Sequence, residues 1–211
     1  MKPKELITAI NGNLKAFIGD SFYLIKHNEF HYKMIGESLA LNRFKNEQEQ
    51  VRVLKWFDKY WLFLEIRFKK IEKEENKKVY KKKELPFNTC ISLSVFQGEE
   101  NDKNKYQLLR AEWDDYNSPN EKHAQPHWHI TSNQAIESTV YEFGDIFEES
   151  YIIRELERQK HEVFDVKKIH FAMNGDWQYN GIHTHRIEDE YQVVKWLQGM
   201  LSYLREELEN E

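Results

Sequence analysis

Cysteine is almost absent from this sequence: Cys90 is the only one in 211 residues. A single cysteine excludes a disulfide framework and a metal site built from several thiolates. Cys90 lies in the run FNTCISLSVF, where a buried and inert thiol is expected rather than a nucleophile. This cysteine usage fits a reducing compartment, and we expect a cytoplasmic protein.

Long apolar runs are also lacking. No stretch approaches the ~20 apolar residues of a membrane-spanning helix, and the N-terminal MKPKELITAI contains no apolar segment of signal-peptide length. We therefore expect no membrane association.

Neither sign of charge dominates, since the net charge is -5. The exception is residues 67–83, which hold nine Lys or Arg against three Glu, a local balance of +6 that leaves the rest of the chain near -11. This stretch is either a solvated surface or a contact for nucleic-acid phosphates or an acidic partner.

Aromatic residues are abundant, at 14% of the chain, with six Trp and thirteen Phe. A chain of this length and composition predicts one folded domain covering residues 1–211 rather than a disordered protein. Within it, residues 1–85 are predicted to be mainly helical and residues 86–211 to contain the sheet.

Helical spacing of apolar residues predicts the N-terminal elements. Residues 3–18 are predicted to form a helix interrupted near Asn11–Asn13, and residues 21–41 favour a helix although neither period is clear. In residues 47–74 apolar side chains recur at steps of three and four, which predicts the strongest helix of the chain.

The middle of the chain alternates apolar and polar residues, which is typical of strands. Strands are predicted over residues 90–96, 106–114 and 125–131, joined by polar connections to form an antiparallel meander. Helical spacing returns in residues 133–160 and 188–209, with a fourth strand over 166–173. The fold class is therefore α+β: an antiparallel β-meander sheet packed by N-terminal and C-terminal helices.

Residues 110–131, RAEWDDYNSPNEKHAQPHWHIT, concentrate the side chains that catalysis and metal binding need. Alternation places Arg110, Glu112 and Asp114 on one face of their strand, and His127 and His129 on one face of the next. The two histidines lie about 7 Å apart along the chain, so both imidazoles can reach one divalent ion, with zinc or manganese favoured.

The third metal ligand has several candidates. Glu112 or Asp114 could supply it from the neighbouring strand, or His183 or His185 from the IHTH turn. Packing alone could also place histidines on a sheet.

Proton transfer and charge stabilisation would fall to other residues of this cluster. Arg110 is either a structural ion-pair partner or a fork for phosphate, and Glu112, Asp114 and His123 are the candidate acid–base groups. Together with a metal ion, these groups indicate phosphodiester chemistry.

Two resemblances follow from these motifs. The text HWHI resembles the His-hydrophobic-His motif of single-strand nicking and rolling-circle replication endonucleases, which implies a tyrosine nucleophile, with Tyr151 the candidate and Tyr141 the fallback. The R-x-E-x-D strand followed by H-x-x-x-H-x-H resembles small bacterial toxins of the TumE-like type. This second resemblance implies a place in toxin–antitoxin or phage-defence loci.

The resulting hypothesis is a metal-dependent phosphodiesterase or nuclease of such a system. The alternative is a non-catalytic adaptor or regulatory subunit, in which the polar cluster is structural and the helices bind a protein partner or a second copy of the chain.

Overall fold

The computed structural model describes residues 1–44, 47–70, 87–102, 105–115, 126–130, 187 and 189–210. In that part of the chain, three helices and eight strands are found. The helices are α1 (Pro3–Asn13), α2 (Lys15–Ile18) and α5 (Glu190–Glu209). The strands are β1 (Leu24–Asn28), β2 (His31–Met34), β3 (Ser38–Phe44), β4 (Glu47–Phe57), β5 (Tyr60–Lys70), β6 (Phe87–Gln97), β7 (Tyr106–Asp114) and β8 (His127–Ile130).

All strand pairs between these elements are antiparallel. The main sheet has the order β1-β2-β5-β6-β7-β8, while β4 pairs with both β3 and β5. The consecutive strands β6, β7 and β8 form the predicted meander. With helices at both ends of the chain, the α+β prediction is confirmed.

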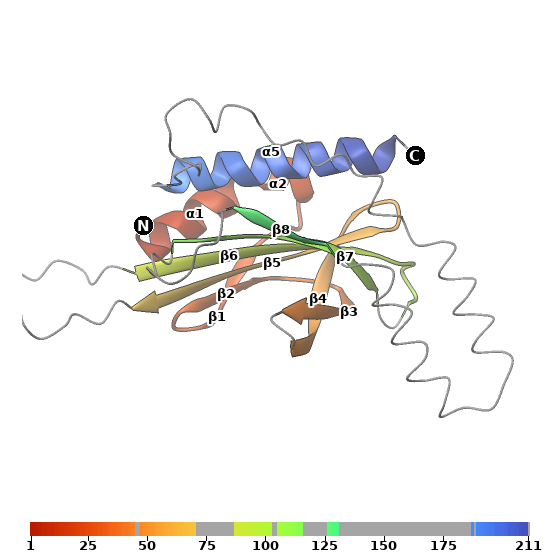
Figure 1. The fold of residues 1–211 in the computed structure, drawn as a ribbon, viewed down its shortest axis with the longest axis horizontal. Helices are drawn as coiled ribbons and strands as arrows, with labels where there is room; N and C mark the ends of the chain where they lie inside the picture. Colours follow the sequence, from red (N-terminus) through yellow and green to blue (C-terminus); the bar gives the residue numbers. More distant parts are fainter. Residues whose placement is uncertain are drawn as a thin grey trace, which may run out of the picture.

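The three helices cover one face of the sheet (Figure 1). Apolar side chains of α1 and α5 pack there against alternate residues of the central strands, such as Leu62, Leu93 and Leu109. The Asp189 carboxylate caps α5 by accepting a hydrogen bond from the Gln192 backbone N–H at 2.8 Å. This layer contains the main hydrophobic core.

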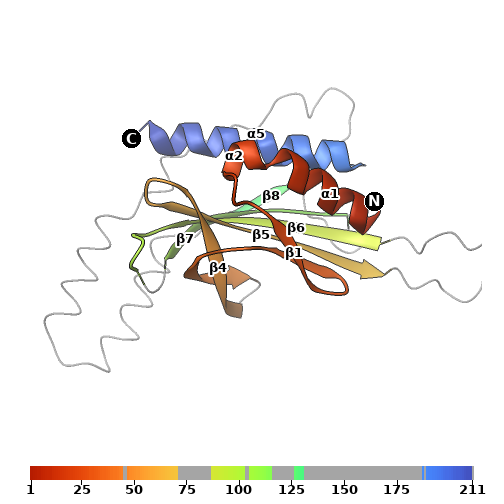
Figure 2. The same cartoon turned by 180° about the vertical axis from the view of Figure 1, so that it is seen from behind.

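The β3–β4 hairpin lies on the opposite face of the sheet (Figure 2). Asn42 on β3 is buried and accepts hydrogen bonds from Ser94 Oγ at 3.0 Å and from Gln107 Nε2 at 3.1 Å. The Arg43 backbone N–H donates to Gln107 Oε1 at 2.7 Å. These contacts hold β3 against β6 and β7, so one face of the central strands is apolar and the other carries buried polar groups.

The predicted helix over residues 47–74 is wrong for residues 47–70, which form the strands β4 and β5, and residues 71–74 lie outside the described residues. Val51 and Val53 of β4 pack into a small cluster under the hairpin, whereas Leu54 and Trp56 pack into the main core. The buried side therefore changes from odd to even positions at the point where β4 leaves β3 and joins β5. Because of this change, Val51 and Leu54 are both buried three residues apart, which matches the spacing of a helix.

Strand β5 adds to the same effect because both of its faces are buried. Trp61 and Phe63 pack under the hairpin, while Leu62, Leu64 and Ile66 pack under the helices. A strand buried on two sides has apolar residues at nearly every position, so a subset always fits helical spacing.

The prediction of a mainly helical segment over residues 1–85 is also wrong for its described part, which is mostly strand up to residue 70. The helix preferred for residues 21–41 is wrong as well, because β1, β2 and most of β3 lie there. The helix over residues 3–18 is confirmed, with its break at Leu14 between α1 and α2. The C-terminal helix over 188–209 is confirmed as α5.

The predicted elements over 133–160 and 166–173 lie outside the described residues. Of the helices that are described, none is long and apolar enough to cross a membrane.

Candidate metal centre

The candidate metal centre is formed by two neighbouring strands whose alternation brings four polar side chains to one face. In the register of β7 and β8, Glu112 lies opposite His127 and Arg110 lies opposite His129. Between these pairs, Ala111 lies opposite Trp128 on the other face, where both pack against the main core. The predicted sharing of faces is therefore confirmed for these four polar residues.

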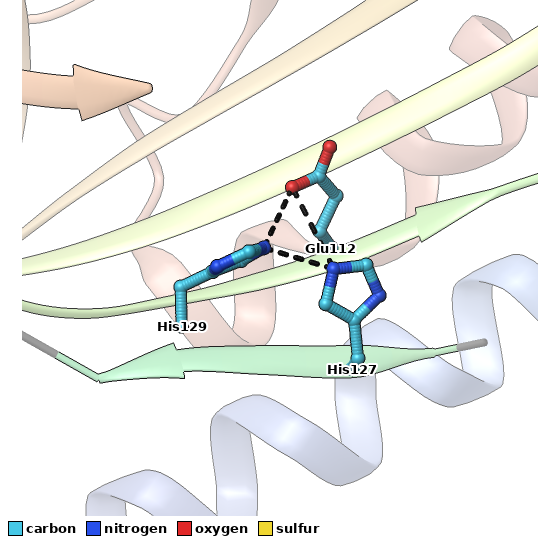
Figure 3. Close-up of side chains that lie close together, drawn as sticks. All are labelled: Glu112, His127 and His129. Atoms are coloured by element: carbon cyan, nitrogen blue, oxygen red, sulfur yellow. Dashed lines mark hydrogen bonds and ion pairs between the residues drawn. The ribbon is translucent and has the colours of Figure 1, made fainter. Parts of the chain in front are cut away.

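The side chains of Glu112, His127 and His129 point toward one another (Figure 3). Glu112 Oε2 lies 3.2 Å from His129 Nε2 and 4.0 Å from His127 Nε2. The two Nε2 atoms are 2.8 Å apart, so one imidazole donates a hydrogen bond to the other. The side chain of Glu112 is buried, while that of His129 is 48% exposed. The carboxylate of this group is therefore enclosed by the protein, and solvent reaches the group at His129.

These separations fit the binding of one metal ion. Zinc with nitrogen and oxygen ligands near 2.1 Å in a tetrahedron places ligand atoms about 3.4 Å from one another. The separations of 2.8, 3.2 and 4.0 Å in the group lie on either side of that value, and one candidate ligand atom from each of the three residues lies within 4.8 Å of the other two. Two imidazoles and one carboxylate supply three ligands and leave positions for water or substrate.

Arg110 holds the carboxylate of this group. Its Nη2 donates to Glu112 Oε2 at 3.1 Å, and its Nη1 donates to the Arg43 backbone carbonyl at 2.6 Å on the β3–β4 hairpin. Both side chains of the Arg110–Glu112 pair are at most 5% exposed. Of the two predicted roles for Arg110, the structure shows the ion pair.

The environment keeps His129 in the form that binds a metal ion. Burial lowers the pKa of His129, and the positive charge of Arg110 and the neighbouring His127 lower it further, while the Glu112 carboxylate opposes them. A lowered pKa leaves the imidazole neutral near pH 7, with a nitrogen lone pair available.

Cys90 contributes structure to this region. Its Sγ donates a weak hydrogen bond to Glu112 Oε1 at 3.6 Å. Burial raises the pKa of the Cys90 thiol far above its ordinary value, and the carboxylates of Glu112 and Asp114 raise it further. The expectation that the Cys90 thiol is buried is confirmed.

The remaining predicted site residues are placed differently. Asp114 is on the same strand and face as Glu112, opposite Cys90, but it is not part of the three-residue group. Strand β8 begins at His127, opposite Glu112, so no residue of that strand faces Asp114. His123, His183, His185 and both candidate tyrosines lie outside the described residues.

A second polar cluster on this face was not predicted from the sequence. It consists of His31 on β2 with Glu65 and Arg67 on β5. The E-x-R pattern on β5 is the same kind of alternation as R-x-E on β7. The signal was hidden because residues 47–74 read as a helix, in which positions two apart do not share a face.

Comparisons with known proteins found no match. No protein-family model matches the chain, and no curated protein or solved structure is similar to it. The resemblance to TumE-like toxins therefore stays a prediction.

Proposed function

We propose that Glu112, His127 and His129 bind a divalent metal ion, zinc or manganese, and that the protein is a metal-dependent phosphodiesterase or nuclease. The observation that carries this proposal is the convergence of one buried carboxylate oxygen and two imidazole nitrogens, of which the one on His129 belongs to a half-exposed side chain. A metal ion bound there would lower the pKa of a coordinated water and polarise a phosphate oxygen.

The protein's own residues have defined parts in this proposal. Glu112 is oriented by Arg110 and by the Cys90 thiol, which fixes the carboxylate before a ligand arrives. Arg110 acts through Glu112 and His129, because its guanidinium is committed to Glu112 and to the hairpin carbonyl. His123 and Asp114 remain proposed acid–base groups. The TumE-like motif supports a setting in bacterial toxin–antitoxin or phage-defence systems.

The second candidate function is a non-catalytic adaptor or regulatory subunit of such a system. It is favoured by the buried Arg110–Glu112 pair, since a buried ion pair also serves to tie a hairpin to a sheet.

A cleavage assay separates these two functions. Single-stranded DNA, single-stranded RNA and bis-p-nitrophenyl phosphate are incubated with the protein and with zinc or manganese, and then with excess chelator. The double variant His127→Ala with His129→Ala is compared with His27→Ala, which removes an exposed histidine on β1.

The proposal expects divalent-dependent cleavage by the wild type and by His27→Ala, and none by the double variant. Cleavage that survives in the double variant would contradict the assignment of the site to His127 and His129. No divalent-dependent cleavage by the wild type would contradict the enzyme proposal and favour the adaptor.

A further inference from the structure

The second cluster places a buried carboxylate beneath two basic side chains. Glu65 Oε2 accepts a hydrogen bond from His31 Nε2 at 2.9 Å, and Arg67 Nη2 donates to Glu65 Oε1 at 3.0 Å. The side chain of Glu65 is 2% exposed, whereas that of Arg67 is 37% exposed. Burial raises the pKa of Glu65, but the His31 hydrogen bond and the Arg67 charge outweigh it, so the pKa is lowered. Glu65 is therefore ionised and holds both basic groups.

The two clusters are related through β6. Ser92 is the register partner of Glu65 on one side and of Glu112 on the other. Beside them, Arg67 lies opposite His31 just as Arg110 lies opposite His129. The same face of the sheet thus presents two glutamate–arginine–histidine clusters on either side of a serine.

The clusters differ at one register position. His127 lies opposite Glu112, whereas the residue opposite Glu65 is Lys33. A charged lysine has no lone pair for a metal ion, so the second cluster lacks the second imidazole of the first. The lysine at this position adds a positive charge to the second cluster where the first cluster has an imidazole.

Three basic side chains share the face of the sheet that carries the second cluster. Lys69 is two residues beyond Arg67 on β5 and exposed, so Lys33, Arg67 and Lys69 share this face with His31. The acids nearest in the described part of this face are Glu65, the half-exposed Glu49 of β4, whose Oε1 lies 2.7 Å from Lys33 Nζ, and Asp114 of β7, which Cys90 separates from Arg67. Arginine with histidine is a common recognition pair for a phosphate group.

We propose that His31 and Arg67, positioned by Glu65, bind a backbone phosphate of a nucleic-acid strand that reaches from this cluster to the candidate metal centre. The inference rests on the proposed function and names its substrate class as a strand of several nucleotides. From β2 to β8 the sheet spans four strand spacings, about 19 Å, which corresponds to roughly five to six nucleotide steps at ~3.4 Å each. Arg67 and Lys69 also begin the basic stretch of residues 67–83.

Binding measurements without cleavage test this site. Fluorescein-labelled single strands of about eight nucleotides and matching dinucleotides, in DNA and RNA form, are titrated with protein in excess chelator and followed by fluorescence anisotropy. The variants are Arg67→Gln and the double variant Glu65→Gln with Arg67→Gln. The double variant removes both charges, so a buried unpaired carboxylate does not compromise folding.

Arg205→Gln is the matched control. Arg205 has similar exposure and also pairs with a glutamate, but it lies on α5, on the other side of the sheet. AMP and inorganic phosphate are added as competitors to separate free phosphate from a strand as the source of the anion.

The wild type is expected to bind the longer strand more tightly than the dinucleotide. Both Arg67 variants should weaken binding of the longer strand roughly 10-fold and reduce the slope of log K against log salt by about 0.7, while Arg205→Gln changes neither. Equal binding by wild type and both Arg67 variants would overturn the proposal. Displacement by AMP or phosphate as effectively as by the longer strand would also overturn it.

The two proposals fail in distinguishable ways. Absence of metal binding and cleavage contradicts the proposed function, yet leaves the anisotropy result interpretable because that assay contains no free metal. Loss of the Arg67 effect contradicts only the strand-binding site.

Discussion

Glu112 on β7 contacts His129 on β8 diagonally: Glu112 Oε2 lies 3.2 Å from His129 Nε2, although the residue directly opposite His129 is Arg110. The same oxygen accepts the hydrogen bond from Arg110 Nη2 at 3.1 Å. One buried carboxylate oxygen therefore joins the internal ion pair to the exposed histidines. Changes at Glu112 should affect stability and metal binding together.

Glu112→Gln is expected to lower the free energy of unfolding by about 3 kcal/mol, because it leaves the Arg110 charge buried without its carboxylate. Urea unfolding in excess chelator measures this without a contribution from bound metal. Adding Arg110→Met to this variant should recover part of the loss, since both charges are then removed. A Glu112→Gln protein as stable as the wild type would show that the pair contributes little.

Cys90 is expected to be unreactive in the folded protein. Its thiol is buried and its raised pKa keeps it un-ionised, so a thiol reagent such as Ellman's should react only as the chain unfolds. The check is the reaction rate in native buffer against that in denaturant, with Cys90→Ala as the blank. Rapid labelling of the native protein would contradict the placement of Cys90 beneath Glu112.

Stability should depend on Glu65 in acid. The pKa of Glu65 is lowered in the folded state, so its contribution is present above its ordinary value of 4.5 and is lost as the pH falls through the lower folded value. The difference in unfolding free energy between wild type and Glu65→Gln should therefore be largest near neutral pH and shrink below 4.5. Urea titrations from neutral pH to about pH 3 measure it. A difference that stays constant over that range would count against the ionised, hydrogen-bonded Glu65.

The turn between β4 and β5 depends on Asp58, whose φ of 42° lies in the left-handed region. Asp58→Gly is expected to be neutral or slightly stabilising, whereas Asp58→Val should lower the unfolding free energy by about 1–2 kcal/mol, because a branched side chain strains that conformation. Lys59→Val is the control, since the positive φ is not shared by Lys59. Equal effects of the two valine substitutions, measured by thermal or urea unfolding, would argue against this hairpin.

The sequence predicted the elements in which burial is one-sided. Strand β7 matches the predicted residues 106–114, because alternation there assigns Ala111 and Trp113 to the helix-covered face and Arg110 and Glu112 to the other. Helix α5 was predicted for the same reason, since its apolar residues follow one stripe. The candidate site was found because its residues lie on such strands.

The elements that were missed have burial on two faces or a change of face. In β4 the buried positions shift from Val53 to Leu54, and in β5 consecutive residues such as Trp61 and Leu62 enter different clusters. Local periodicity cannot report such a shift, because it depends on which distant strand each half of β4 contacts. The cluster around Glu65 was not predicted, because its strand β5 was assigned to a helix.

Metal binding by the purified protein tests the central claim most directly. Metal-free protein is titrated with zinc and with manganese in a calorimeter, and the metal content after gel filtration is measured by elemental analysis. The wild type and His27→Ala should each bind one equivalent of metal ion, and His127→Ala with His129→Ala should bind none, in keeping with a single three-ligand group in the part of the chain that the structure describes. A wild type that binds no divalent ion, or a double variant that binds as much as the wild type, would contradict the metal centre at Glu112, His127 and His129.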